Sequence, residues 1–110
     1  IVTSPFFFDE NDEVLASWAK TFEERAGFAP TIHPAEAYDT VYLIANAVER
    51  IGDGEITREA IQQQLDQSEN TGITGELNFT EDGDIIRNYM ICGVQNGEWV
   101  VLEGFDYVNE

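Results

Sequence analysis

The sequence has little cysteine, little positive charge and no long hydrophobic run. Cys92 is the single cysteine among 110 residues, which excludes an internal disulfide and any metal site built from several cysteines. Because a thiolate is disfavoured in a strongly acidic protein, Cys92 is expected to be a small buried side chain rather than a reactive one. No run of about 18 apolar residues is present, so the sequence encodes no transmembrane helix.

Basic residues are equally scarce. Lys and Arg together number 5 against 22 Asp and Glu, which gives a formal net charge of −17 at pH 7. A nucleic-acid-binding surface needs bases to displace counterions from phosphates, and an anionic membrane surface attracts bases, so this charge excludes both partners. The 43% of hydrophobic residues still suffices for a packed core, in one modest domain or in part of a larger one.

The beginning of the chain predicts a strand and a helix. Residues 1–8 are largely apolar, and Pro5 should interrupt a strand there because it cannot donate a ladder hydrogen bond. The acidic residues 9–13 supply cap candidates for a helix over residues 12–26, with favourable charges in its first turn. Gly27 suits the position just after the end of that helix.

Two further helices are expected, over residues 34–51 and 58–68. Pro34 suits the first position of the former, and Thr57 is the expected cap of the latter. The longer helix carries a wide apolar stripe and is therefore expected to be the most buried. Its stripe consists of Ala37, Tyr38, Val41, Ile44, Ala45, Val48 and Ile51.

Strand signals replace helical ones after Asn70. An extended run over residues 85–94 is followed by Asn96-Gly97, a strong two-residue hairpin signal, and by a returning strand over residues 98–102. Residues 105–108 predict a weaker strand or tail. The predicted order is a strand, three helices and an antiparallel β-meander, and the helical and β parts need not share one core. Because a lone hairpin is only marginally stable in water, the meander should require a partner surface.

Candidate chemistry is sparse. His33 is the only histidine, and its ordinary role is a position near a helix start, with a place in a ligand cleft as the alternative. Catalysis by a small hydrolase built around His33 is the least favoured interpretation, since no nucleophile motif accompanies it. The acidic cluster at residues 9–13 lacks the Gly and Glu that a calcium loop requires. No metal, no cofactor and no enzymatic activity is predicted.

Four stretches taken together resemble type I periplasmic binding proteins, in the branched-chain amino acid-binding (extracellular ligand-binding receptor) family of ABC transporters. Order and spacing agree over most of the chain, although Thr40 and Thr80 depart from the usual residues. The stretches are Val2-Thr3-Ser4-Pro5-Phe6, Glu36-Ala37-Tyr38-Asp39-Thr40-Val41-Tyr42, Thr74-Gly75-Glu76-Leu77-Asn78-Phe79 with Asp82-Gly83-Asp84, and Gln95-Asn96-Gly97-Glu98-Trp99-Val100.

The resemblance implies an α/β fold: the C-terminal portion of a longer, two-lobed type I periplasmic-binding-protein fold with three hinge crossings. By this resemblance residues 1–8 are a hinge-crossing strand, residues 9–69 are a helical part of the N-terminal lobe, and residues 70–110 are a crossing and a β-hairpin of the C-terminal lobe. The chain starts without Met in an expected strand, which also favours a piece of a longer protein.

The resemblance also implies a function: capture of a small polar solute, such as a branched-chain amino acid, between two lobes, with ABC importer membrane subunits as partners. The location would be periplasmic or extracellular, with a lipid anchor left open. His33, Glu36 and Tyr38 are the ligand-binding candidates, because the family places contacts where the chain enters this helix. A free-standing α+β interaction module that pairs through its hairpin edge is the alternative. The isolated chain is expected to form a dimer or a swapped oligomer.

Overall fold

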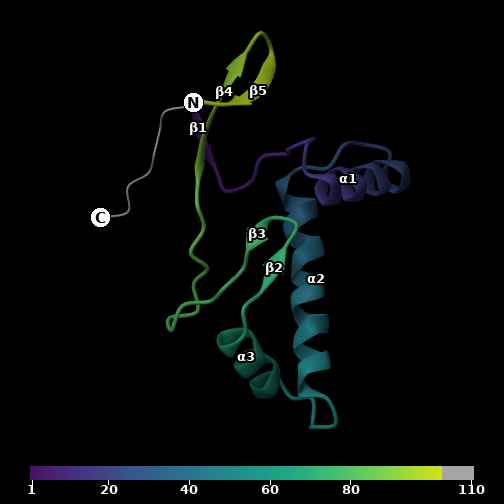
Figure 1. Cartoon of the computed structure of the whole chain (residues 1–110), viewed down its shortest axis with the longest axis vertical. Helices are drawn as coiled ribbons and strands as arrows, with labels where there is room; N and C mark the ends of the chain where they lie inside the picture. The colour runs from purple at the N-terminus through teal and green to yellow at the C-terminus, as the bar shows by residue number, and fades with distance from the viewer. Residues whose placement is uncertain (103–110) are drawn as a thin grey trace.

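The computed structural model describes residues 1–102 and contains three helices and five short strands in that range (Figure 1). The weaker strand or tail expected at residues 105–108 lies outside the described residues. In chain order the elements are β1 (Val2–Ser4), α1 (Glu13–Ala26), α2 (Ile32–Ile51), α3 (Arg58–Gln67), β2 (Thr71–Gly72), β3 (Gly75–Glu76), β4 (Met90–Gln95) and β5 (Glu98–Val101).

Caps fix both ends of α1, as the sequence predicts. The Asp12 side chain accepts hydrogen bonds from the backbone N–H groups of Val14 and Leu15, both at 3.0 Å. At the other end, Gly27 adopts φ 80° and its N–H donates to the carbonyl of Glu23. A left-handed residue is needed there, and glycine adopts that conformation without a Cβ clash.

The predicted start of α2 was two residues late, because Ile32 and His33 already belong to the helix. Pro34 therefore occupies the third position rather than the first. Proline is tolerated there because the first four N–H groups of a helix have no intrahelical partner to lose. α3 matches its expected range closely, and the Thr57 hydroxyl caps it by accepting from the N–H of Ala60 at 3.1 Å.

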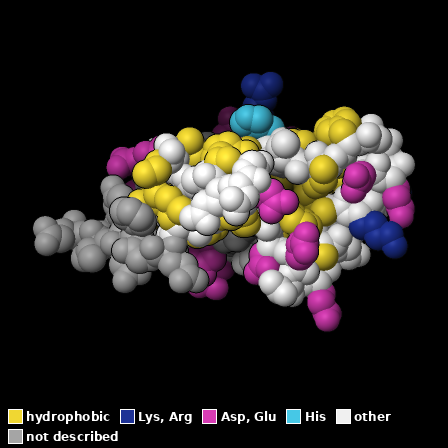
Figure 2. Space-filling view, turned by 90° about the horizontal axis from the view of Figure 1, so that it is seen from above, with side chains coloured by type: hydrophobic (Ala, Val, Ile, Leu, Met, Phe, Trp, Pro, Cys, Tyr) yellow, Lys and Arg dark blue, Asp and Glu magenta, His cyan; other side chains and the backbone are white. Residues whose placement is uncertain are grey.

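The apolar stripe predicted to bury α2 is largely open to solvent. Val41 is 66% exposed and Ile44 is 46% exposed, and Ala37 and Ala45 are exposed as well. The buried positions lie on another face, at Ala35, Asp39 and Ala47. The expectation about the stripe was wrong because the close contacts of α2 with α3 and β2 leave Val41 and Ile44 exposed in residues 1–102, while Tyr38 contacts Trp18 and is 37% exposed. Figure 2 shows hydrophobic side chains exposed between acids on the face that it presents.

A buried carboxylate attaches the β2–β3 turn to α2. Asp39 is 3% exposed and accepts from the backbone N–H of Ile73 at 2.8 Å and of Thr74 at 2.9 Å, and from the Thr74 hydroxyl at 2.6 Å. Charge-assisted bonds of this kind are about twice as strong as neutral ones. A Cβ added at Gly72 would overlap this carboxylate, so glycine is required for the close approach.

A second link joins the far end of α2 to the chain after α3. The Arg50 guanidinium donates to the Asn70 side-chain oxygen at 2.9 Å, and the Asn70 carbonyl accepts from the N–H of Leu77 at 2.9 Å. Asn70 and Leu77 are both buried, at 4% and 1% exposure. The segment that leads out of α3 is therefore held against α2 at two places.

The three-stranded sheet has the order β1-β4-β5, with both pairs antiparallel. The Asn96-Gly97 turn is confirmed: both residues adopt positive φ, 55° and 85°, as a type I′ turn requires. The strands at residues 1–8 and 85–94 are shorter than expected. Pro5 ends β1 at Ser4, so β4 has a partner on that side only from Met90 onward.

The helical half and the sheet half stand apart, as the sequence suggests. Helix α2 packs against α3 and against strand β2, whereas in residues 1–102 no closely packed pair of elements joins β1, β4 or β5 to a helix. Figure 1 shows the long extended segment before β4 running from one half to the other. The radius of gyration is 16.5 Å, against about 13 Å for a compact domain of this length.

We expect Gly72→Ala to lower the free energy of unfolding by about 1–3 kcal/mol, because its methyl group overlaps the Asp39 carboxylate. Urea denaturation of the protein measures this change. In an Asp39→Ala background the same substitution should cost much less, since the overlapping group is gone. Equal costs in the two backgrounds would show that the contact does not constrain the turn.

Candidate functional site

Two of the three predicted site residues lie together on the first turns of α2. His33 Nδ1 is 3.6 Å from Glu36 Oε2, and the two residues are one helical turn apart. The His33 side chain is 88% exposed and that of Glu36 is 40% exposed. His33 therefore has the exposed position near a helix start that its ordinary role predicts, and Glu36 is the less exposed of the two.

Arg87, which is distant in the sequence, lies next to Glu36. It lies in the extended segment before β4, and its Nη1 is 3.8 Å from Glu36 Oε1. Both contacts of Glu36 are longer than a hydrogen bond, so its contact with the Arg87 guanidinium is Coulombic. Sequence reasoning missed Arg87, since in a chain with so many acids the sequence gives no sign of which acid a base will meet.

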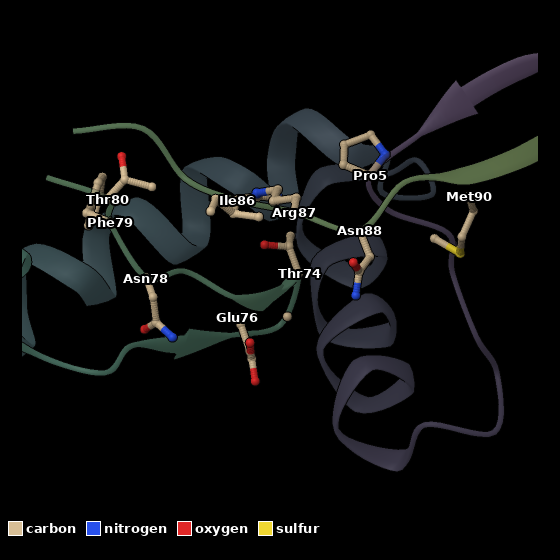
Figure 3. A pocket seen from close by; sticks show the side chains of 11 residues that line it. Pro5, Thr74, Glu76, Asn78, Phe79, Thr80, Ile86, Arg87, Asn88 and Met90 are labelled. Atoms are coloured by element: carbon tan, nitrogen blue, oxygen red, sulfur yellow. The ribbon is translucent and has the colours of Figure 1, made fainter. Parts of the chain in front are cut away.

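A cavity of about 500 Å³ lies beside Arg87 (Figure 3). The residues around it come from the stretch at and around β3, from the stretch that leads into β4, and from Pro5 just after β1, so three distant chain segments form its walls. Most of its hydrogen-bonding groups are uncharged, and Glu76 and Arg87 are its charged residues. The lining residues are Pro5, Thr74, Gly75, Glu76, Asn78, Phe79, Thr80, Ile86, Arg87, Asn88 and Met90.

Tyr38, the third predicted residue, lies in a different place. Its ring is 5.7 Å from that of Trp18 and 4.7 Å from that of Tyr42, in a row of aromatic contacts between α1 and α2. These three rings line a separate cavity of about 670 Å³. Tyr38 is two residues from Glu36 on the same helix, so the two side chains leave on opposite faces.

The pKa of Tyr38 is raised above its ordinary value of 10.0, first by a hydrogen bond with the Tyr42 side chain. Desolvation and the negative charges that Tyr42 and Asp39 can carry act in the same direction. All of these effects favour the neutral phenol. Tyr38 is therefore an uncharged hydrogen-bonding and stacking group at neutral pH.

The remaining candidates have structural roles. Asp9 accepts from the backbone and side-chain nitrogens of Asn11, which lowers its pKa, and Asp12 caps α1. Cys92 is buried in β4, as expected. Within residues 1–102, no group of three or more His, Cys, Asp and Glu side chains is placed to share a metal ion. No helix in that range is long and apolar enough to cross a membrane.

The sequence and the fold of this chain match those of known proteins. A family model for periplasmic binding proteins matches residues 1–98, which is most of the chain. The chain belongs to the periplasmic binding protein family. Members of this family are binding proteins, and the fold is accordingly part of a type I periplasmic binding protein, as the sequence predicts. A comparison with curated proteins finds no match.

Two solved structures match the periplasmic binding protein fold of this chain with a TM-score of 0.72. One is a leucine binding protein from Thermotoga maritima, with 24% sequence identity, and that likeness concerns the fold alone. The other is assigned as a branched-chain amino acid ABC transporter from Rhodospirillum rubrum, with 26% identity. Each alignment covers 91% of this chain but 29% of the solved one, so the chain spans less than a third of their length.

We expect Tyr42→Phe to lower the pKa of Tyr38 toward 10.0, because the hydrogen bond that favours its neutral form is lost. Tyr38 should then ionise at a lower pH in an alkaline titration followed by phenolate absorbance. The Tyr38→Phe variant identifies which step belongs to this residue. An unchanged or higher pKa in Tyr42→Phe would contradict the assignment.

Proposed function

We propose that this chain is the C-terminal portion of the solute-binding protein of an ABC importer, which captures a small polar solute between two lobes. The observation that carries the proposal is the family match over residues 1–98. The solved neighbours, named for leucine and for branched-chain amino acids, make an amino acid the first candidate solute. Importer membrane subunits are the partners, and the location is periplasmic or extracellular, with or without a lipid anchor.

The two separate halves are assigned to two lobes. Residues 1–8 are a hinge-crossing strand, residues 9–69 cover the N-terminal lobe, and residues 70–110 supply another crossing and the hairpin of the C-terminal lobe. The separation of the β1-β4-β5 sheet from the helices supports a division into two lobes, and so does the extended segment that joins them (Figure 1), whereas β2, within residues 70–110, packs against α2 of the helical half. Residues 103–110 lie outside the described part of the chain.

Solute capture requires no covalent chemistry. A solute that contacts both lobes binds the closed form more tightly than the open form, so it shifts the population toward closure. His33, Glu36 and Tyr38 are the candidate contacts from this chain. Glu36 is the best supported of them, because it lies 3.8 Å from Arg87, which belongs to the extended segment that joins the two halves.

A free-standing interaction module that pairs through its hairpin is the alternative. The outer edge of β5 is unpaired in residues 1–102, which is the feature such a module would use. The family match over nearly the whole chain favours the importer component instead.

Calorimetric titration of the full-length protein with amino acids tests the proposal. We expect saturable binding of at least one of them, with one solute per protein, because two lobes enclose a single cleft. A titration of the 110-residue chain alone should give no comparable heat, since half a cleft cannot enclose a solute. Absence of binding to all amino acids by the full-length protein would overturn the proposal.

The open apolar stripe of α2 also generates a prediction about the isolated chain. We expect the 110-residue polypeptide to self-associate as a dimer or a swapped oligomer, because exposed apolar faces and unpaired strand edges favour association. Sedimentation measures its mass. Val41→Glu with Ile44→Glu should reduce association strongly, whereas Val14→Glu on α1, also exposed, is the matched control. A stable monomer with a cooperative melt would contradict this expectation.

A further inference from the structure

The acidic side chains of this chain face solvent and are not paired with bases. Every Asp and Glu in residues 1–102 is exposed, apart from Glu36, which is partly buried, and Asp39, which is buried. In the same range Glu36 is the one acid with a basic side chain at ion-pair distance. No base in the described part of the chain is therefore placed to neutralise an exposed acid directly.

The imbalance of charge is large. Five bases stand against 22 acids, and Lys20 is the one lysine, which leaves a formal net charge of −17 on 110 residues. A net charge far from zero keeps a protein soluble, but the self-repulsion destabilises its compact state. Folding of this chain therefore has to overcome a repulsion that its own bases do not relieve.

The helices also carry acids where their own dipoles disfavour them. Asp66 lies in the last turn of α3, which contains no base, and the last turn of α1 contains Glu23 and Glu24 against the single base Arg25. A negative charge near the C-terminal end of a helix meets the partial negative charge of the unpaired carbonyls there. Salt screens this repulsion, so the stability of α1 and α3 should increase with ionic strength.

The spacing of the acids sets how much salt is needed. Acids follow one another directly at Glu23-Glu24 and at Glu81-Asp82, and the Cα atoms of such neighbours are about 3.8 Å apart. The screening length is about 10 Å at an ionic strength of 0.1 M and falls to about 3 Å only at 1 M. Screening between neighbours this close therefore requires molar salt.

The acids do not form a discrete cation site in the described structure. Within residues 1–102 no group of three or more His, Cys, Asp and Glu side chains is placed to hold a metal ion. Cations that accompany this surface therefore act as a diffuse layer, so sodium and potassium should be equivalent and the effect should not saturate at millimolar concentration.

We propose that this protein is built to fold in molar monovalent salt, with a diffuse layer of hydrated cations as the partner of its acidic surface. The proposal depends on the charge and exposure of the acids and not on which solute the protein binds. On the function proposed above the protein lies outside the cytoplasm, so its surrounding medium would itself be strongly saline.

Thermal unfolding of the full-length protein, followed by circular dichroism without any solute, tests the proposal. Between about 0.1 M and about 1 M KCl we expect the Tm to rise by at least about 10 °C, and by the same amount in NaCl. A smaller rise, or a fall, would overturn the proposal. So would an equal rise in sucrose at low salt, because sucrose strengthens apolar burial without screening charge. Neither result would affect the proposed solute capture.

Substitutions on the surface test whether repulsion between acids is the cause. Removing four exposed acids that make no ion pair or side-chain hydrogen bond in residues 1–102 should raise the Tm of the full-length protein by about 2–4 °C in 0.1 M KCl and leave it unchanged in 1 M KCl. The combined variant is Asp53→Asn, Glu55→Gln, Asp66→Asn and Glu69→Gln.

Gln63→Glu is the matched variant of opposite sign. Gln63 is exposed on α3, four residues after Glu59 and three before Asp66, so the new carboxylate has an acid one helical turn away on each side. We expect it to lower the Tm in 0.1 M KCl and to have no effect in 1 M KCl. Shifts of equal size at both salt concentrations, in this variant or in the combined one, would overturn the assignment to charge repulsion.

Discussion

The carboxylate of Asp39 is the constraint on which the helical half depends. It lies buried in the middle of α2 and accepts three hydrogen bonds from two residues of the β2–β3 turn. Gly72 is needed so that the turn can approach this carboxylate closely. The hydrogen bond between Arg50 and Asn70 holds the start of the same segment near the C-terminal end of α2. Everything that follows β3, including the segment that carries Arg87, starts from this attachment, so Asp39 indirectly sets where Arg87 can meet Glu36.

The apolar stripe of α2 differs in burial from the face of the helix around Asp39. The buried face packs within the chain, whereas Val41 and Ile44 face solvent in the described structure. A chain that spans 29% of its solved relatives leaves most of a two-lobed fold to other residues. Large apolar side chains with no cover in 1–102 are expected of a helix that completes its packing against those residues.

Local signals in the sequence predicted the local structure well. The caps at Asp12, Thr57 and Gly27 and the Asn96-Gly97 turn lie where expected, because each depends on a residue's own backbone preference. The burial of α2 could not be predicted, since periodicity identifies an apolar face but not whether a neighbour covers it. Arg87 and Asp39 were missed as key residues for a related reason: contacts between segments 34 or more residues apart leave no local signal.

The pairing of β1 with β4 has a consequence for how the protein is made. Val2 lies opposite Cys92, so the first strand of this chain finds its neighbour only after some ninety further residues have left the ribosome. Contacts of such long sequence separation form slowly, while the helices between them can form early. During synthesis β1 (Val2–Ser4) therefore stays without its β4 partner until residues 90–92 have been made, so the three-stranded sheet is the last part of the described fold to form.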